Sequence, residues 1–251
     1  MTPGFQLRPS ALFLLILALS PLGYAQTPAP GASPANTPTV SAPATNASAA
    51  SDAQAKATQQ TLIEGFQLAG QGKLDAALAN ANSILQTDPK NMMGLSLRGN
   101  IYTEKKLWDL AVKDYQTMLQ IDAKNSPARF NLAEIKFQQK DYDGARSGFV
   151  AMEKDADLGD LATFKVFLCD LFGGHEDVAS KEFDAFNQVG GNPSYYFANV
   201  AWYLYHHKIE DARSWLTSAI NIYSDSPRKI NFYTKSLRDL GYLPIPAPPP
   251  K

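Results

Sequence analysis

The sequence predicts an all-α solenoid of about five stacked helix-turn-helix repeats, on the strength of two observations. Two nearly identical heptapeptides, LQTDPKN at 85–91 and LQIDAKN at 119–125, lie 34 residues apart. Alanine recurs with almost the same period, which is the signature of a repeat protein built from two-helix units. These alanines, at intervals of 34, 34, 34 and 33 residues, are Ala77, Ala111, Ala145, Ala179 and Ala212.

Each period has room for two short helices and two turns. Leu62, Phe66 and Ala69 form one apolar stripe at helical spacing, and similar stripes recur in the next two periods. An acidic residue one or two places before each alanine suits the start of a second helix. Pro89 and Pro193 break outer turns, because the residue before a proline avoids helical angles. Inner turns are predicted at Gly72, Lys106, Lys140, Gly174 and Lys208.

The pattern resembles the tetratricopeptide repeat family over roughly residues 58–225. That resemblance implies a right-handed α-solenoid in which small residues sit where two helices touch. In this chain the small residues are Gly65, Ala77, Gly99, Ala111, Ala133, Ala145, Ala179 and Ala212. The repeats are predicted to start near Thr58, Met92, Ser126, Asp160 and Pro193. Phe167 and Val200 replace the small residue in the last two repeats, so we expect wider or shifted packing there.

The N-terminal segment has the layout of a signal peptide. Arg8 precedes the apolar run Ala11–Leu19, and Gly23 and Ala25 supply the small residues of a cleavage site. Residues 1–25 are therefore predicted to be removed, leaving an exported protein that is periplasmic or secreted and soluble. The alternative is an uncleaved anchor, but a membrane span needs roughly 20 apolar residues. No cysteine lies near the cut, which argues against a lipid anchor.

Residues 26–57 are rich in alanine, proline, serine and threonine, so we expect a flexible, disordered linker there. After the repeats, residues 226–243 carry one apolar stripe and predict a helix that caps the last repeat. Residues 244–251, PIPAPPPK, predict an extended proline-rich tail.

The composition argues against several functions. A formal net charge of −1 offers no excess of positive charge to bind nucleic acid. The single cysteine, Cys169, cannot form an internal disulfide, and its apolar surroundings predict an inert buried thiol. The three histidines form no metal-binding motif, and no catalytic or phosphate-binding motif occurs. We therefore expect no enzymatic activity, no cofactor and no metal site.

The resemblance implies that function lies on the concave surface, which the first helix of each repeat would line. The candidate groove residues are Phe130, Phe137, Leu161, Phe164, Leu168, Phe172, Phe197 and Tyr205. They would make the groove apolar towards its C-terminal half. The alternative is that these side chains belong to the core, or lie beneath the C-terminal helix or the tail.

The sequence thus predicts a non-enzymatic scaffold of the cell envelope that binds a polypeptide segment of another protein. The alternative is a structural component that self-associates or packs against a membrane protein, without a peptide ligand. The chain carries no feature that names the partner.

Overall fold

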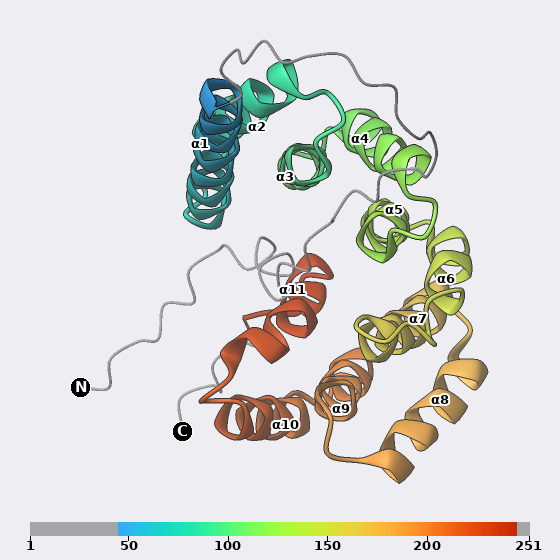
Figure 1. Ribbon diagram of the computed structural model, residues 1–251. Coiled ribbons are helices and arrows are strands. Elements are labelled where there is room, and N and C mark those ends of the chain that lie inside the picture. Colours follow the sequence, from blue (N-terminus) through green and yellow to red (C-terminus); the bar gives the residue numbers. More distant parts are fainter. Residues whose placement is uncertain (1–44, 245–251) are drawn as a thin grey trace, which may run out of the picture.

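The computed structural model describes residues 45–244, apart from the side chains of 45–50 and of Val189. Ten helices in this range form five hairpins that follow one another along an arc, with α3, α5, α7 and α9 on its inner side (Figure 1). The all-α solenoid is confirmed. The helices are α1 (Thr45–Gly70), α2 (Leu74–Thr87), α3 (Met92–Glu104), α4 (Trp108–Ile121), α5 (Ser126–Gln138), α6 (Tyr142–Val150), α7 (Gly159–Gly173), α8 (Glu176–Val189), α9 (Pro193–Tyr205) and α10 (Ile209–Ile222), followed by the 3-10 helix η2 (Pro227–Ile230) and α11 (Asn231–Asp239).

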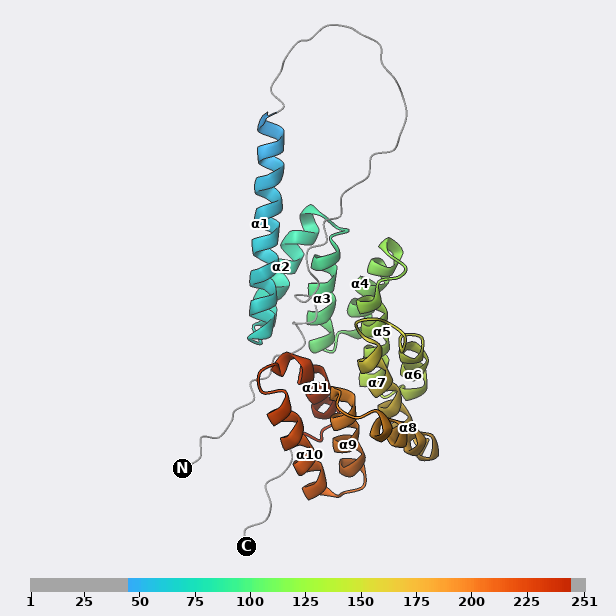
Figure 2. The same cartoon turned by 60° about the horizontal axis from the view of Figure 1, so that its bottom comes forward.

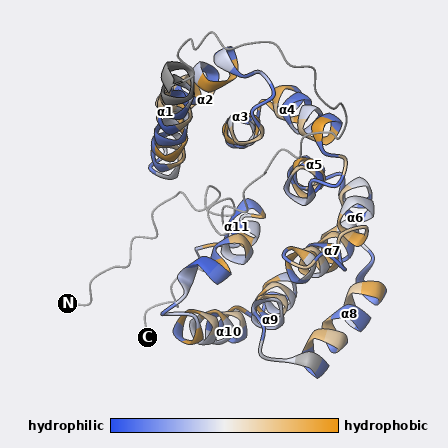
Figure 3. Ribbon diagram, viewed as in Figure 1, coloured by the Kyte–Doolittle hydropathy of each residue, from blue (hydrophilic) through white to orange (hydrophobic). Residues whose placement is uncertain are grey.

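The observed helix starts follow the predicted period closely. The first helices of repeats two, three and five begin at Met92, Ser126 and Pro193, as predicted, and α7 begins one residue early at Gly159. Hydrophobic and hydrophilic residues alternate around most helices (Figure 3), as expected where one face packs inward and the other meets water. No helix within residues 45–244 is both long enough and apolar enough to cross a membrane.

Residues 45–57 are helical, where we expected flexible linker. They form the first half of α1, and this half extends beyond α2 and α3 (Figure 2). The segment follows the last proline of the linker, Pro43, and is rich in alanine, the strongest helix former. Intrinsic propensity therefore accounts for a helix that packing does not require. The predicted signal peptide, the linker up to residue 44 and the tail from residue 245 lie outside the described residues.

The repeated heptapeptide is a turn followed by a helix cap. Its aspartate accepts a hydrogen bond from the backbone N–H two residues on, at Asp88 (3.2 Å) and Asp122 (3.0 Å). Its final asparagine caps the next helix: Asn91 and Asn125 each accept a bond of 2.9 Å from the backbone N–H three residues on. Asn192 caps α9 in the same way. The asparagine therefore recurs where it caps the first helix of a hairpin, at α3, α5 and α9, whereas α7 begins without a side-chain cap.

The inner turns share a left-handed backbone. Gly72 and Gly174 have φ of 76° and 89°, and Lys106 and Lys140 have φ of 58° and 65° although they are not glycine. In the fifth repeat this position is His207 (φ 59°), so the predicted inner turn at Lys208 is displaced by one residue. The last interval between the recurring alanines is also one residue shorter, which accounts for the shift.

The predicted packing residues lie where helices touch. The five recurring alanines are fully buried, and Ala133 is nearly so. A Cβ added to Gly65 would lie 2.5 Å from Leu97 Cδ2, and one added to Gly99 would lie 2.8 Å from Tyr115 Cε1. Only glycine permits these approaches without displacing a neighbour.

The third and fourth repeats are irregular. Helix α6 ends at Val150 and a series of turns leads to α7. Asp155 organises these turns by accepting bonds from the backbone N–H groups of Asp157 and Leu158 and from the hydroxyl of Ser126. Phe167, which replaces the small residue of the repeat pattern, is fully buried. Its ring meets that of Phe186 on α8 edge-on, with ring centres 5.6 Å apart.

The C-terminal helix lies inside the arc. Figures 1 and 2 place α11 on the inner side of the solenoid, and it packs against α9. Helix α10, which ends the solenoid, meets η2 and leaves Ile220 and Ile222 exposed by 43% and 54%. A helix that capped the last repeat would cover the outer face of α10. The predicted helix exists, but α11 occupies the concave surface.

Candidate functional site: the concave surface

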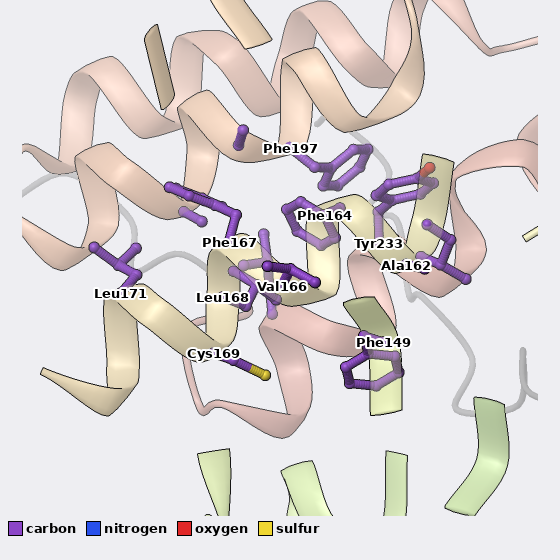
Figure 4. Packing of buried hydrophobic residues seen from close by; sticks show 14 of the residues in the cluster. Phe149, Ala162, Phe164, Val166, Phe167, Leu168, Cys169, Leu171, Phe197 and Tyr233 are labelled. Carbon is purple, nitrogen blue, oxygen red and sulfur yellow. The ribbon is translucent and has the colours of Figure 1, made fainter. Parts of the chain in front are cut away.

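The aromatic ring of Tyr233 anchors α11 to the concave surface. It lies 5.0 Å from the ring centre of Phe164 on α7 and stacks on Phe197 of α9 at 5.3 Å (Figure 4). Its hydroxyl donates a hydrogen bond of 2.5 Å to Oδ2 of Asp160, at the start of α7. Burial and this carboxylate both raise the pKa of Tyr233, so it stays a neutral donor. Helix α11 is thus held by both apolar and polar contacts.

The predicted groove residues form part of the core and not an exposed strip. Phe164, Leu168 and Phe197 are fully buried, and Phe130, Phe137 and Leu161 are exposed by only 2–6%. Phe172 and Tyr205 are half-buried and meet each other edge-on at 5.6 Å. The prediction of an apolar groove open to solvent therefore does not match the structure. Tyr233 of α11 covers Phe164 and Phe197, whereas Phe130 and Phe137 pack against Phe149 and Tyr142 of α6. Both parts of the alternative, burial in the core and coverage by the C-terminal helix, therefore describe what is observed.

A small pocket lies between α11 and the inner helices α3, α5 and α7. Its cavity volume is about 30 Å³, room for one or two water molecules. The inner helices contribute both apolar and polar side chains to its lining, and α11 closes it. The lining residues are Ser96, Asn100, Pro127, Phe130, Asn131, Glu134, Leu161, Lys165, Phe232, Lys235 and Ser236.

A buried ion pair lies at the base of this pocket. Lys165 Nζ lies 2.7 Å from Glu134 Oε2, and the two residues are exposed by only 2% and 5%. The same ammonium lies 4.2 Å above the ring of Phe137, a cation–π contact. Neither ion-paired atom makes a well-aligned hydrogen bond within the described residues. Each charge therefore depends on the other for compensation.

Lys235 of α11 extends this charge cluster. Its Nζ lies 2.7 Å from Asp239 on the same helix and 3.4 Å from Glu104 at the end of α3. Burial alone would lower the pKa of Lys235, but these carboxylates outweigh it and the pKa is raised. Burial would likewise raise the pKa of Glu134, but the charges of Lys165 and Lys235 and the hydrogen bonds it accepts lower it. Both groups are therefore charged at neutral pH.

Asparagine side chains line the N-terminal wall of the pocket. Asn100 Oδ1 accepts a hydrogen bond of 2.7 Å from the hydroxyl of Tyr115. It also accepts a longer one, 3.4 Å, from Nδ2 of Asn131 on the next repeat. These bonds fix Asn100 with its oxygen satisfied. Neighbouring repeats thus present amide groups side by side on the concave surface.

The comparisons with known proteins agree with this architecture. Residues 102–157 match the sequence model of the tetratricopeptide repeat family. The chain is a tetratricopeptide repeat protein. A thermophilic TPR protein of Thermus thermophilus has a similar structure, with a TM-score of 0.55 and 17% identity, over 73% of this chain and 98% of that one. A tetratricopeptide repeat protein from Parabacteroides merdae gives 0.53 and 19%, over 74% and 80%. No curated protein matches the sequence significantly.

A tetratricopeptide repeat solenoid is a scaffold whose concave surface serves protein–protein interaction. This TPR protein shows no cluster of metal-binding side chains within residues 45–244. Its Cys169 is 1% exposed, so the predicted burial of the thiol is confirmed, and burial raises the pKa of the thiol to about 12.

Two features of the site escaped the sequence analysis of this TPR protein. The first is the Glu134–Lys165 pair, for which the available signal was a single lysine within the apolar segment LATFKVFLCDLF. The second is the anchoring of α11 on the concave surface, which the sequence offered only as an alternative, since an apolar stripe does not say which surface it covers. Both features depend on contacts between separate repeats.

Proposed function

We propose that this TPR protein is an exported, non-enzymatic scaffold of the cell envelope that binds a polypeptide segment of a partner protein on its concave surface. The observation that carries the proposal is the mixed lining of that surface. The amide groups of Asn100 and Asn131, from repeats two and three, lie near Phe130 of repeat three and Leu161 of repeat four. Such a surface offers hydrogen bonds to a polypeptide backbone and apolar contacts to its side chains. Export is inferred from the signal-peptide layout of residues 1–25.

Affinity capture from the envelope fraction, followed by mass spectrometry, tests the binding function. The matched pair of variants is Met93→Arg, in the first turn of the inner helix α3, and Gln116→Arg, on α4. Both side chains are exposed, so both variants should fold as the wild type does. We expect Met93→Arg to weaken capture and Gln116→Arg to leave it unchanged. Equal capture by both variants would place the binding surface elsewhere.

The intact mass of the exported protein tests its location. A mass that begins at Gln26, in the fraction not bound to membranes, is the expected result. A mass that still includes residues 1–25, recovered with the membrane pellet, would contradict it.

A second candidate function is end-to-end assembly of the solenoid, and one observation favours it. Ile220 and Ile222 lie exposed on the terminal helix α10, which α11 leaves uncovered. Sedimentation of the wild type and of an Ile220→Lys/Ile222→Lys variant tests this. Larger species that disappear in the variant would support assembly, and a monomeric wild type would contradict it.

A further inference from the structure

Helix α11 binds the concave surface in the manner of a ligand. Tyr233 and Leu237 lie one helical turn apart on the same face, and both are buried against the inner helices. Lys235 projects towards Glu104 of α3, so the contacts of this short helix reach from repeat two to repeat five. This arrangement is a helix-in-groove interaction within one chain.

The receiving surface is complementary to those three side chains. Phe164 and Phe197 enclose the ring of Tyr233, and Asp160 accepts a hydrogen bond from its hydroxyl. The carboxylate of Glu104 faces Lys235, and that of Glu134 adds to the negative charge around it. The surface therefore favours a helix that carries a phenol, an amine and an aliphatic group at these intervals.

Packing against the solenoid maintains α11, through these three side chains and through neighbours such as Phe232 and Tyr242. It has nine residues, whereas isolated helices shorter than about 12–15 residues are marginal in water. Its N-cap residue, Ile230, makes no side-chain capping bond. The stability of α11 therefore comes from the concave surface, and another helix with the same three groups could obtain the same contacts.

While α11 is in place, this part of the surface has no room for a polypeptide. The cavity beneath it has a volume of about 30 Å³, and the aromatic side chains behind Tyr233 are fully buried. A partner that uses Phe164 and Phe197 must therefore take the position that α11 holds.

We propose that the surface formed by α3, α7 and α9 is a receptor for a short amphipathic helix of another protein, which binds by replacing α11. The partner helix carries a tyrosine, a basic residue two positions on and an aliphatic residue four positions on, as in Tyr233-x-Lys235-x-Leu237. The inference rests on the proposed function. It specifies that the bound polypeptide is a short amphipathic helix and that it binds when α11 leaves the concave surface.

The first test uses a fluorescein-labelled synthetic peptide of residues 226–243 as the probe, with full-length proteins. Tyr233→Ala removes the main anchor of the resident helix, so this variant should bind the probe at least tenfold more tightly than the wild type. Lys229→Ala, at an exposed position of η2, is the control and should bind like the wild type. Equal binding by a folded Tyr233→Ala variant would overturn the proposal.

The second test fixes α11 in place and does not depend on Tyr233→Ala folding. Glu104→Cys and Lys235→Cys are joined by a cleavable bis-maleimide, which is selective because Cys169 is buried. The linked chain should lose probe binding, and reductive cleavage should restore it. A linked chain that binds as well as the cleaved one would overturn replacement of α11.

Two further outcomes separate this inference from the function on which it rests. Capture of the same envelope partner by linked and cleaved chains would preserve the scaffold function and overturn the replacement of α11. A concentration-dependent dimer that excess probe dissociates would place α11 of a second copy in the groove. That result would overturn the claim that the partner is another protein.

Discussion

The buried Glu134–Lys165 pair makes a quantitative prediction about the concave surface. Lys165→Met leaves the carboxylate of Glu134 without its nearest counter-charge, and Glu134→Met leaves the ammonium of Lys165 without one. Breaking one side of a buried ion pair costs about 3–5 kcal/mol. The side chains of Lys165 and Glu134 are exposed by only 3% and 7%, so little of this cost can be relieved by water.

The double variant should behave differently from the sum of its parts. Replacing both partners with methionine fills similar volume and removes both desolvation costs, so the free energy of unfolding should return to within about 1 kcal/mol of wild type or exceed it. Gln138 loses the acceptor Glu134 Oε1 but is half-buried and can reach water.

Urea unfolding, followed by circular dichroism, measures the three variants and the wild type. The expected coupling is several kcal/mol, obtained as the double-variant effect minus the two single effects. Additive single effects of less than about 1 kcal/mol each would mean that the pair is open to solvent. That result would contradict the burial of the charge pair at the base of the pocket.

The remaining predictions concern the repeats and their charges. Ala111→Leu should overpack the contact between two helices and lower the free energy of unfolding by about 1–3 kcal/mol. Lys106→Leu, in an exposed turn, should change it much less. Equal melting temperatures for the two variants would refute the repeat register. Lys140→Gly should raise the free energy of unfolding, measured in urea, by about 0.5–1 kcal/mol, because φ at residue 140 is 65° and L-residues disfavour the left-handed region. A lower free energy of unfolding in this variant would show that the lysine is not strained. Burial and the charge of Asp170 raise the pKa of Glu182 to about 8, from an unfolded value near 4.5. Between about pH 4.5 and pH 8 the folded state holds a proton that the unfolded state has lost, so the free energy of unfolding falls as pH rises through this range. Glu182→Gln should match the wild type near pH 4 and exceed it near pH 9 in thermal melts, and a constant difference at all pH values would contradict this assignment.

The periodic part of the fold was predictable from the sequence because every repeat solves the same packing problem. The alanines at the helix contacts recur for steric reasons, and Asn91 and Asn125 recur because each caps the first helix of its hairpin. Departures from the period were harder to predict. The early end of α6 depends on hydrogen bonds of Asp155 to the following turn and to Ser126. These contacts belong to one repeat only.

The candidate site was predictable only in part. Phe164 and Phe197 hold equivalent positions in successive repeats, and in the structure both contact the ring of Tyr233. Their burial was not predictable, because it depends on α11 returning to α7 from a distant part of the sequence. The apolar stripe of α11 has the same pattern whether it covers the end of the solenoid or its concave surface. Only the three-dimensional structure distinguishes these arrangements.

Hydrogen–deuterium exchange gives the most direct test of the central claim, that α11 is a replaceable occupant of the concave surface. The full chain would carry a heavy nitrogen label, so that its own residues 226–243 differ in mass from an added unlabelled peptide of the same sequence. The peptide would be present at about 1 mM or above, the scale of the effective concentration of a tethered segment. We expect the added peptide to speed the exchange of backbone amide hydrogens in residues 231–239 of the chain, while those of α5, α7 and α9 remain protected. Unchanged exchange in residues 231–239, or loss of protection in α7 together with α11, would show that α11 is a fixed part of the core.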